Sequence, residues 1–419
     1  MEKKEIGSDK KDSNCLEHKT IFSKEKINLG RQPEVDYLKA LGIFLMVSTH
    51  VYDNYSKGYL HKIIYFLAFI LGAAGFMLLM GLSTQYSRSH TPKKYIIRGF
   101  GLITIGQLLN LLRDTLPNLI AWWATGNQVF ISRAMLVLQA DILSFAGIAF
   151  IFFGILKIMK LSNGLILIIS FIMNILAYPL YKIMKPPKSF LQSQLLGYIV
   201  LTDAEAFFPF CSYFIFVVFG YWLGDIYKHI ADKDKLSTRI LIFCIPIVTI
   251  YYIFRSHSNF PYLPKYFSDE HYSLCPGPDA AITCMTNIIA LAFFHKLDVM
   301  LKGTPEFIIH AGKNLTQYYI LSCLFIVPME VFMIATNGER YPKEMKLPTV
   351  YAIMILVLCR IIIDINDKYI HFTITTLKNP MQNIVFVLIW IFTIISVIYI
   401  YPKVEVYATF WNNYLRPLE

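Results

Sequence analysis

The segment from Ile63 to Tyr86 reads IIYFLAFILGAAGFMLLMGLSTQY, without a single aspartate, glutamate, lysine, arginine or histidine. A helix needs about 20 predominantly apolar residues to cross the hydrocarbon core of a bilayer. The segment is continuously apolar and lacks the period-two alternation that a barrel strand would show. It therefore predicts a transmembrane helix.

Segments of the same kind recur along the whole chain. Of the 419 residues, 56% are hydrophobic and only 16% are charged, whereas a soluble domain carries roughly a quarter charged residues. We predict an all-α polytopic integral membrane protein with about 11 transmembrane helices in one domain, residues 37–401, between polar tails at 1–36 and 402–419. The predicted spans are 37–55, 63–86, 96–113, 134–156, 163–181, 207–226, 240–254, 280–298, 306–335, 348–366 and 382–401.

Charge patterning gives an orientation and excludes some partners. Lysine and arginine are slightly more frequent on the side of the N-terminus, which predicts a multi-pass cell-membrane protein with a cytosolic N-terminus. The tail 1–36 carries almost as many acidic as basic residues, which argues against a nucleic-acid-binding arm despite the net charge of +11. The seven cysteines show no CxxC motif and no cysteine–histidine spacing, so we expect no metal site.

Three predicted spans carry polar side chains near their outer ends. Ionisable and amide groups within a membrane span are costly, so a shared depth indicates a wet cavity open to the outside. His50 and Asp53 are three residues apart and share a helix face. A histidine beside a carboxylate suits a general base, although His50 could also be a hydrogen-bonded interfacial histidine without a catalytic role. The full outer group is His50, Asp53, Gln107, Asn110, Gln139 and Asp141.

A second group of polar side chains lies toward the predicted inner face. Together its basic members would form an electropositive mouth suited to a phosphorylated cofactor. Simpler explanations stay open, because Arg360 and Asp364 are four residues apart and could pair, and topology alone could account for Lys94 and Arg98. The inner group is Lys94, Arg98, Asn314, Gln317, Arg360 and Asp364.

Glycines at positions 99, 101 and 106 follow no predicted strand, so they are no dinucleotide-binding fingerprint. Small residues on membrane helices allow close approach of a neighbouring helix. We therefore predict that Gly99, Gly101 and Gly106 serve helix packing.

The segment from Arg31 through Asp36 to His50, RQPEVDYLKALGIFLMVSTH, resembles the opening of the transmembrane acyltransferases. That superfamily includes the acyltransferase-3 proteins and the heparan-α-glucosaminide N-acetyltransferase-like proteins, and the histidine at the outer end of the first span suits the second branch better. The resemblance extends to about Ile320. Further similar segments are Gly75–Gly81, Arg98–Gly106, Leu138–Leu143 and Gly312–Tyr318.

The resemblance implies a helical bundle around a central cavity for an acyl-CoA and an acceptor. Acyl-CoA, with acetyl-CoA as the default, would enter from the cytosol and be held by Lys94, Arg98, Asn314 and Arg360. His50 would be the catalytic base, with Asp53 and Asp141 beside it, and the acceptor would meet Gln107, Asn110 and Gln139. The acceptor would be an extracytoplasmic glycan or small molecule, and a homodimer stays open. Two departures from the family pattern are Lys39-Ala40, in place of arginine–glycine, and Asn314, in place of serine or alanine.

Two other classes of function stay open on the sequence. A transporter of a small amphipathic solute would also place polar groups inside the membrane, but no internal repeat is visible and the polar positions lie toward the two faces rather than the midplane. A non-catalytic receptor or scaffold could use the same fold. Release of free CoA from acetyl-CoA separates the enzyme from both alternatives.

Overall fold

The computed structural model describes residues 20–55, 59–87, 91–139, 141–184, 196–200, 208–258, 274–337, 347–370 and 380–405. These residues are almost entirely helical, and the β-structure within them is one isolated bridge between Phe22 and Ile230. Nine of the described helical segments are long and apolar enough to cross a membrane. The predicted all-α polytopic membrane fold is confirmed.

Several spans are interrupted by short stretches of π- or 3₁₀-helix, labelled η. The elements are α1 (Pro33–Tyr55), α2 (Tyr59–Leu67), η1 (Ala68–Ala73), α3 (Ala74–Gln85), α4 (Pro92–Asn110), η2 (Leu111–Thr115), α5 (Leu116–Thr125), α6 (Gln128–Ala134), η3 (Met135–Leu138), α7 (Ile142–Ile158), α8 (Asn163–Met184), α10 (Phe210–Lys228), α11 (Lys233–His257), α13 (Pro278–Leu301), α14 (Glu306–Lys313), α15 (Leu315–Asn337), α16 (Pro348–Ile365), η4 (Asn366–Ile370) and α17 (Pro380–Glu405).

Two predicted spans, the first and the fourth, correspond to helices outside those nine. The first is α1, which has charged residues near both of its ends, and the fourth is α7, which is only 17 residues long. Helix α1 lies at the predicted place, whereas the predicted start of the fourth span at residue 134 is wrong, because η3 ends at Leu138 and α7 begins only at Ile142. That either helix crosses the membrane rests on the sequence pattern. The number of 11 spans therefore stays a prediction.

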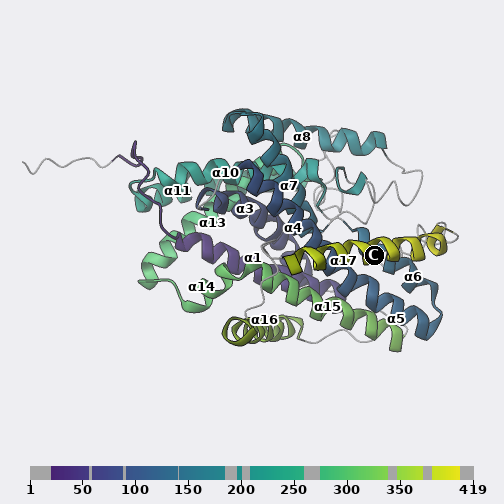
Figure 1. Cartoon of the computed structure of the whole chain (residues 1–419). Helices are drawn as coiled ribbons and strands as arrows, with labels where there is room; N and C mark the ends of the chain where they lie inside the picture. Colours follow the sequence, from purple (N-terminus) through teal and green to yellow (C-terminus); the bar gives the residue numbers. More distant parts are fainter. Residues whose placement is uncertain are drawn as a thin grey trace, which may run out of the picture.

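Helix α1 lies in the middle of the bundle (Figure 1). It packs against η1, α13, α14, α15 and α16. Pro33 starts the helix, and Glu34 and Asp36 occupy its first turn, where negative charge is favourable. Because α1 touches so many neighbours, its polar residues face protein rather than lipid.

The predicted end of the third span near residue 113 is wrong. The helix continues from α4 through the π-helical turn η2 into α5, so that residues Pro92–Thr125 form one stretch of 34 residues. The charged residues Arg113 and Asp114 lie where the predicted span ended, and in the structure their side chains pair with each other inside the protein. Pro117 is the second residue of α5, directly after the π-helical turn. Gly126, with φ of 69°, ends the helix in the left-handed conformation.

Helices α4 and α7 cross at glycines. A Cβ added to Gly99 would lie 2.5 Å from the carbonyl oxygen of Gly147, and one added to Gly106 would lie 2.9 Å from Oγ of Ser144. No atom lies within 4 Å of the corresponding position at Gly101. The packing role is thus confirmed for Gly99 and Gly106, and Gly101 has no such role.

These two kinds of glycine give a matched pair of variants on one helix. Gly99→Ala should lower the stability of the detergent-solubilised protein by about 1–3 kcal/mol, because the new methyl group must push the backbone of α7 away. Gly101→Ala should be neutral or slightly stabilising, since alanine has the better helix propensity. The unfolding midpoint of each variant tests this, and equal midpoints would contradict the packing.

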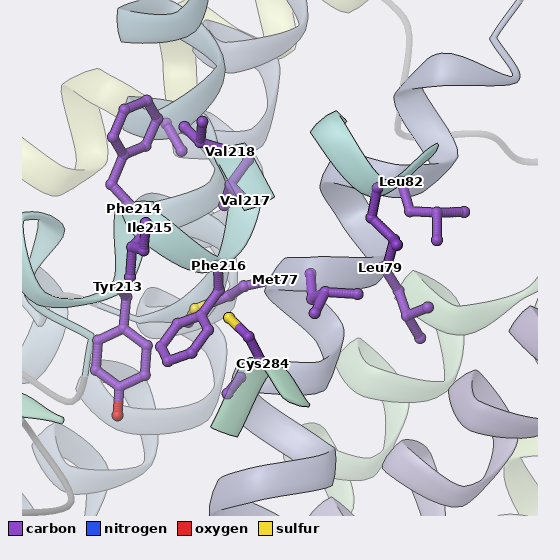
Figure 2. Packing of buried hydrophobic residues seen from close by; sticks show 14 of the residues in the cluster. Met77, Leu79, Leu82, Tyr213, Phe214, Ile215, Phe216, Val217, Val218 and Cys284 are labelled. Carbon is purple, nitrogen blue, oxygen red and sulfur yellow. The ribbon is translucent and has the colours of Figure 1, made fainter. Parts of the chain in front are cut away.

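Helices α3 and α10 make a second close crossing within the largest hydrophobic cluster. A Cβ on Gly220 would lie only 1.9 Å from the carbonyl oxygen of Leu78. Figure 2 shows Met77, Leu79 and Leu82 of α3 near the run of α10 from Tyr213 to Val218, with Cys284 of α13 beside them. This tightly packed apolar part supports one side of the bundle, and the buried network around Arg113 lies outside it.

Candidate functional site

A buried arginine lies at the centre of the outer polar group. Arg113 is in η2, the π-helical turn between α4 and α5, and only 6% of its surface is exposed. Its Nε donates to Oδ2 of Asp114 at 2.7 Å, and its Nη2 donates to Oδ1 of Asn110 at 3.1 Å. A π-turn places neighbouring side chains differently from an α-turn and often marks a functional site.

The second element of this cluster is the break between η3 and α7. Asp141 is the N-cap of α7, and its carboxylate accepts from the backbone N–H of Ile142. Oδ2 of the same carboxylate lies 3.1 Å from Nη1 of Arg113, and Oε1 of Gln139 accepts from Nη2 of Arg113 at 3.1 Å. The amide nitrogen of Asn110 donates to the carbonyl oxygens of Val137 and Gln139, both at 3.2 Å, and so joins the end of α4 to this break.

Helix α15 contributes the third set of contacts to the cluster around Arg113. The Tyr319 hydroxyl donates to Oδ1 of Asp141, and Nη1 of Arg113 lies 3.5 Å from the same hydroxyl. Thus three stretches of chain, residues 110–114, 139–141 and 319, enclose one guanidinium with two carboxylates. The predicted meeting of Asn110, Gln139 and Asp141 is what the structure shows, and the buried ion network that joins them was not foreseen.

His50 lies in the C-terminal half of α1 and is partly exposed. The charged groups close enough to act electrostatically on its imidazole are Asp53, Arg113, Asp141 and Glu330. No hydrogen-bond partner of His50 occurs among the described residues. Three of these groups are acidic and one is basic, so the charged neighbours favour an imidazolium, whereas the loss of water around the ring opposes it. A neutral imidazole at this position can chemically act as a proton acceptor.

Asp53 shares its carboxylate with a histidine that sequence reasoning did not single out. Oδ1 of Asp53 lies 2.5 Å from Nε2 of His61, which follows in α2. Asp53 also acts electrostatically on His50, and its predicted place beside a catalytic His50 stays a prediction. Gln107 lies apart from this pair, and its amide nitrogen donates to the Tyr198 hydroxyl at 3.3 Å.

At the opposite end of the bundle, two of the predicted cofactor-binding residues are exposed. Lys94 and Arg98 lie in the first turns of α4, and the Arg98 guanidinium carbon is 4.6 Å from the centre of the Phe150 ring. Arg98 has no carboxylate partner within the part of the chain that the structure describes. Lys39 of α1 lies within electrostatic range of both Arg98 and Arg31. Lys39, Arg31 and Arg98 form a positive group near the start of α1, in which Asp36 pairs with Arg31 and Lys94 lies one turn before Arg98 on α4.

The other two predicted cofactor residues belong to a separate polar cluster. The Asn314 amide lies 3.2 Å from Nε2 of His310, and that nitrogen is 2.9 Å from Oδ1 of Asp364. Arg360 is 3.5 Å from Oδ2 of Asp364, so the simple pairing considered from the sequence is present. The structure does not join Asn314 and Arg360 to Lys94 and Arg98 by any contact among the described side chains.

Two of the segments that resemble the transmembrane acyltransferases are in contact with each other. Asp36 accepts a hydrogen bond from Nε of Arg31, and a Cβ on Gly312 would lie 2.4 Å from Oδ1 of Asp36. Arg31 also donates to the carbonyl oxygen of Ile309 at 3.0 Å. The opening of α1 and the end of α14 are therefore fitted to each other, and Gly312 leaves the space that Asp36 occupies.

Sequence reasoning missed Arg113, His61, Tyr319 and His310. Arg113-Asp114 is a charged pair at the predicted end of the third span. His61 lies two residues before the second predicted span, and His310 lies near the start of the ninth. No three metal-ligating side chains come together within the described ranges.

Comparison with known proteins adds one match. A family profile described as heparan-alpha-glucosaminide N-acetyltransferase, catalytic, matches residues 31–253, slightly more than half of the chain. This range includes His50, Arg98, Arg113 and Asp141, while Asn314 and Arg360 lie beyond it. Searches of curated proteins and of solved structures gave no match. The chain belongs to the heparan-alpha-glucosaminide N-acetyltransferase catalytic family.

Proposed function

We propose that this protein is a membrane acyltransferase that moves an acyl group, acetyl by default, from acyl-CoA to a carbohydrate acceptor. The acceptor offers a hydroxyl or an amine on the outer side of the cell membrane, and the N-terminus is cytosolic. The single observation that supports this best is His50. It has no hydrogen-bond partner among the described residues, and the charges of Asp53, Arg113, Asp141 and Glu330 act on it, inside the range matched by the family.

In the proposed reaction, His50 carries the proton from the acceptor to the departing thiolate. Its neutral ring takes the proton of the acceptor hydroxyl or amine, whose oxygen or nitrogen forms a bond with the thioester carbonyl carbon. The carbon–sulfur bond then breaks, and the proton passes from the imidazolium to the departing CoA thiolate. Asp53 and Asp141 stabilise the imidazolium electrostatically, and Arg113 keeps the Asp141 carboxylate in place.

The positive group near the start of α1 fits the phosphates of the acyl donor. Arg98 is exposed and stacked on Phe150, so its guanidinium is held without being neutralised by a described carboxylate. Arginine binds phosphate through two parallel hydrogen bonds, and Lys94 and Lys39 add charge nearby. Arg360, by contrast, is already paired with Asp364, which weakens its earlier assignment to the donor.

The proposal is tested by thiol release. Purified protein in lipid nanodiscs is incubated with acetyl-CoA and a panel of amino sugars and neutral sugars, and free CoA is measured. An enzyme releases CoA only when a suitable acceptor is present, and mass spectrometry shows the acetylated sugar. A transporter or a scaffold would release none with any acceptor.

Replacing Arg98 with alanine should raise the KM for acyl-CoA about tenfold or more and leave kcat nearly unchanged. The phosphate contact is present in both the ground state and the transition state, so its loss weakens both equally. The matched control is Lys368→Ala, an exposed lysine in η4 beyond the donor region. An unchanged KM in a normally folded Arg98→Ala protein would leave Arg98 only as a topology anchor.

A further inference from the structure

A cavity lies between the start of α1 and the helices α10, α11 and α13. Its polar lining consists of Glu34, Tyr227, Lys233, Ser237 and His295. The rest of its wall is leucine, isoleucine and alanine from α10, α11 and α13. One end of the cavity is thus charged and the remainder is hydrocarbon-like.

Glu34 is the buried group that needs an explanation. Only 1% of its surface is exposed, and its Oε1 accepts from Nζ of Lys233 at 2.8 Å. Its Oε2 has no hydrogen-bond partner among the described residues. A buried carboxylate oxygen without a donor is unfavourable, so an oxygen that lines a cavity indicates a donor supplied from outside.

Lys233 bonds only one of the two oxygens of the carboxylate. Its ammonium donates to Oε1 of Glu34 and to Oε1 of Gln32, while Oε2 of Glu34 has no donor among the described residues. The strongest bond that a ligand can add to a carboxylate comes from a positively charged N–H donor.

The position of the cavity points to a lipid as the source of that donor. Helix α11 begins at Lys233 with exposed charged residues and continues into an exposed apolar surface that includes Ile242 and Phe243. Lys233 therefore lies where a membrane helix passes from water into hydrocarbon. A lipid headgroup lies at this depth, and the exposed apolar surface of α11 is suited to its acyl chains.

The cavity is separate from the proposed donor site. Glu34 and Lys39 are five residues apart on α1, which places them about 140° apart around the helix axis. Lys39 lies within electrostatic range of Arg98, whereas Glu34 bonds Lys233 of α11. The two sites therefore use different sides of the same helix end.

We infer that this cavity is a binding site for a phospholipid with a primary amine in its headgroup, such as phosphatidylethanolamine. The ammonium end of the headgroup enters the cavity and donates to Oε2 of Glu34, and the acyl chains lie outside it on the exposed apolar surface of α11. The inference does not depend on the acyltransferase proposal, because it concerns neither His50 nor Arg98.

The test measures retention and stabilisation by defined lipids. Delipidated protein is titrated with short-chain phosphatidylethanolamine or phosphatidylcholine, and with phosphoethanolamine as the headgroup alone. Native mass spectrometry counts bound molecules, and the unfolding midpoint reports stabilisation. We expect one phosphatidylethanolamine per chain and a rise in midpoint of several degrees, with little effect from phosphatidylcholine, whose quaternary ammonium has no N–H.

Variants separate this site from unspecific lipid effects. Glu34→Gln removes the charge and should weaken phosphatidylethanolamine binding about tenfold or more. Ser237→Leu fills the cavity from α11, leaves Glu34 and Lys233 intact, and should have the same effect. The control is Lys235→Gln, on the exposed face of the same helix.

Three results would overturn the inference. Equal stabilisation by the two lipids would remove the role of the amine. Full retention of binding in the Ser237→Leu protein would place the lipid elsewhere. Stabilisation by phosphoethanolamine equal to that by the lipid would show a site for a free amine, with no part for the acyl chains.

Discussion

His50→Ala should lower the turnover of acyl transfer at least about 100-fold while expression and acyl-CoA binding stay close to wild type. A positioned general base contributes roughly 10²–10⁴-fold, and no other described histidine lies among the charged groups that act on this position. His50→Gln should be almost as inactive, because an amide can form hydrogen bonds but cannot take up the proton. The measurement is CoA release at saturating acetyl-CoA and acceptor.

The control variant is His257→Ala, which removes an exposed histidine at the end of α11. Asp53→Asn should be milder than His50→Ala, because Asp53 acts on His50 through its charge while its hydrogen bond goes to His61. Turnover should also fall as the pH drops through the pKa of the imidazole, since the protonated ring cannot accept a proton. If His50→Ala retains more than about a tenth of wild-type turnover, the general base is not His50.

Arg113→Met should destabilise the protein by about 3–5 kcal/mol and abolish activity. The change leaves the carboxylates of Asp114 and Asp141 buried without their shared cation, and breaking a buried ion pair from one side costs this much. Arg113→Lys should recover only part of the stability, because a lysine cannot reproduce the contacts that the planar guanidinium makes with Asn110 and Gln139. The unfolding midpoint in detergent is the measurement.

A triple variant that removes all three charges tests whether the unpaired carboxylates cause the loss of stability. Arg113→Met with Asp114→Asn and Asp141→Asn removes all three charges, so much of the lost stability should return while activity stays low. Arg239→Met, at an exposed position of α11, is the control for the loss of one arginine. A loss of less than about 1 kcal/mol in the single variant, similar to that control, would contradict the ion network.

The outer part of the candidate site was largely predictable, and the inner part was not. His50, Asn110, Gln139 and Asp141 were identified because polar groups in a membrane span are costly, which holds for any arrangement of the helices. Arg113 was misplaced because the boundary of a helix is the least certain part of a sequence-based assignment. The separation of Asn314 and Arg360 from Lys94 and Arg98 depends on which helices pack together, and periodicity carries no such information.

The sequence by itself determined that this chain is an all-α membrane protein and where most of its helices lie. Both follow from the length and apolar character of single segments, because a helix satisfies its own backbone hydrogen bonds in the bilayer. Only the tertiary structure decided that Arg113 joins Asp114 to Asp141, that Asp53 meets His61, and that Gly312 makes room for Asp36. Most of these contacts join different helices of the chain. Their partners are chosen by packing and charge in three dimensions, which no single segment encodes.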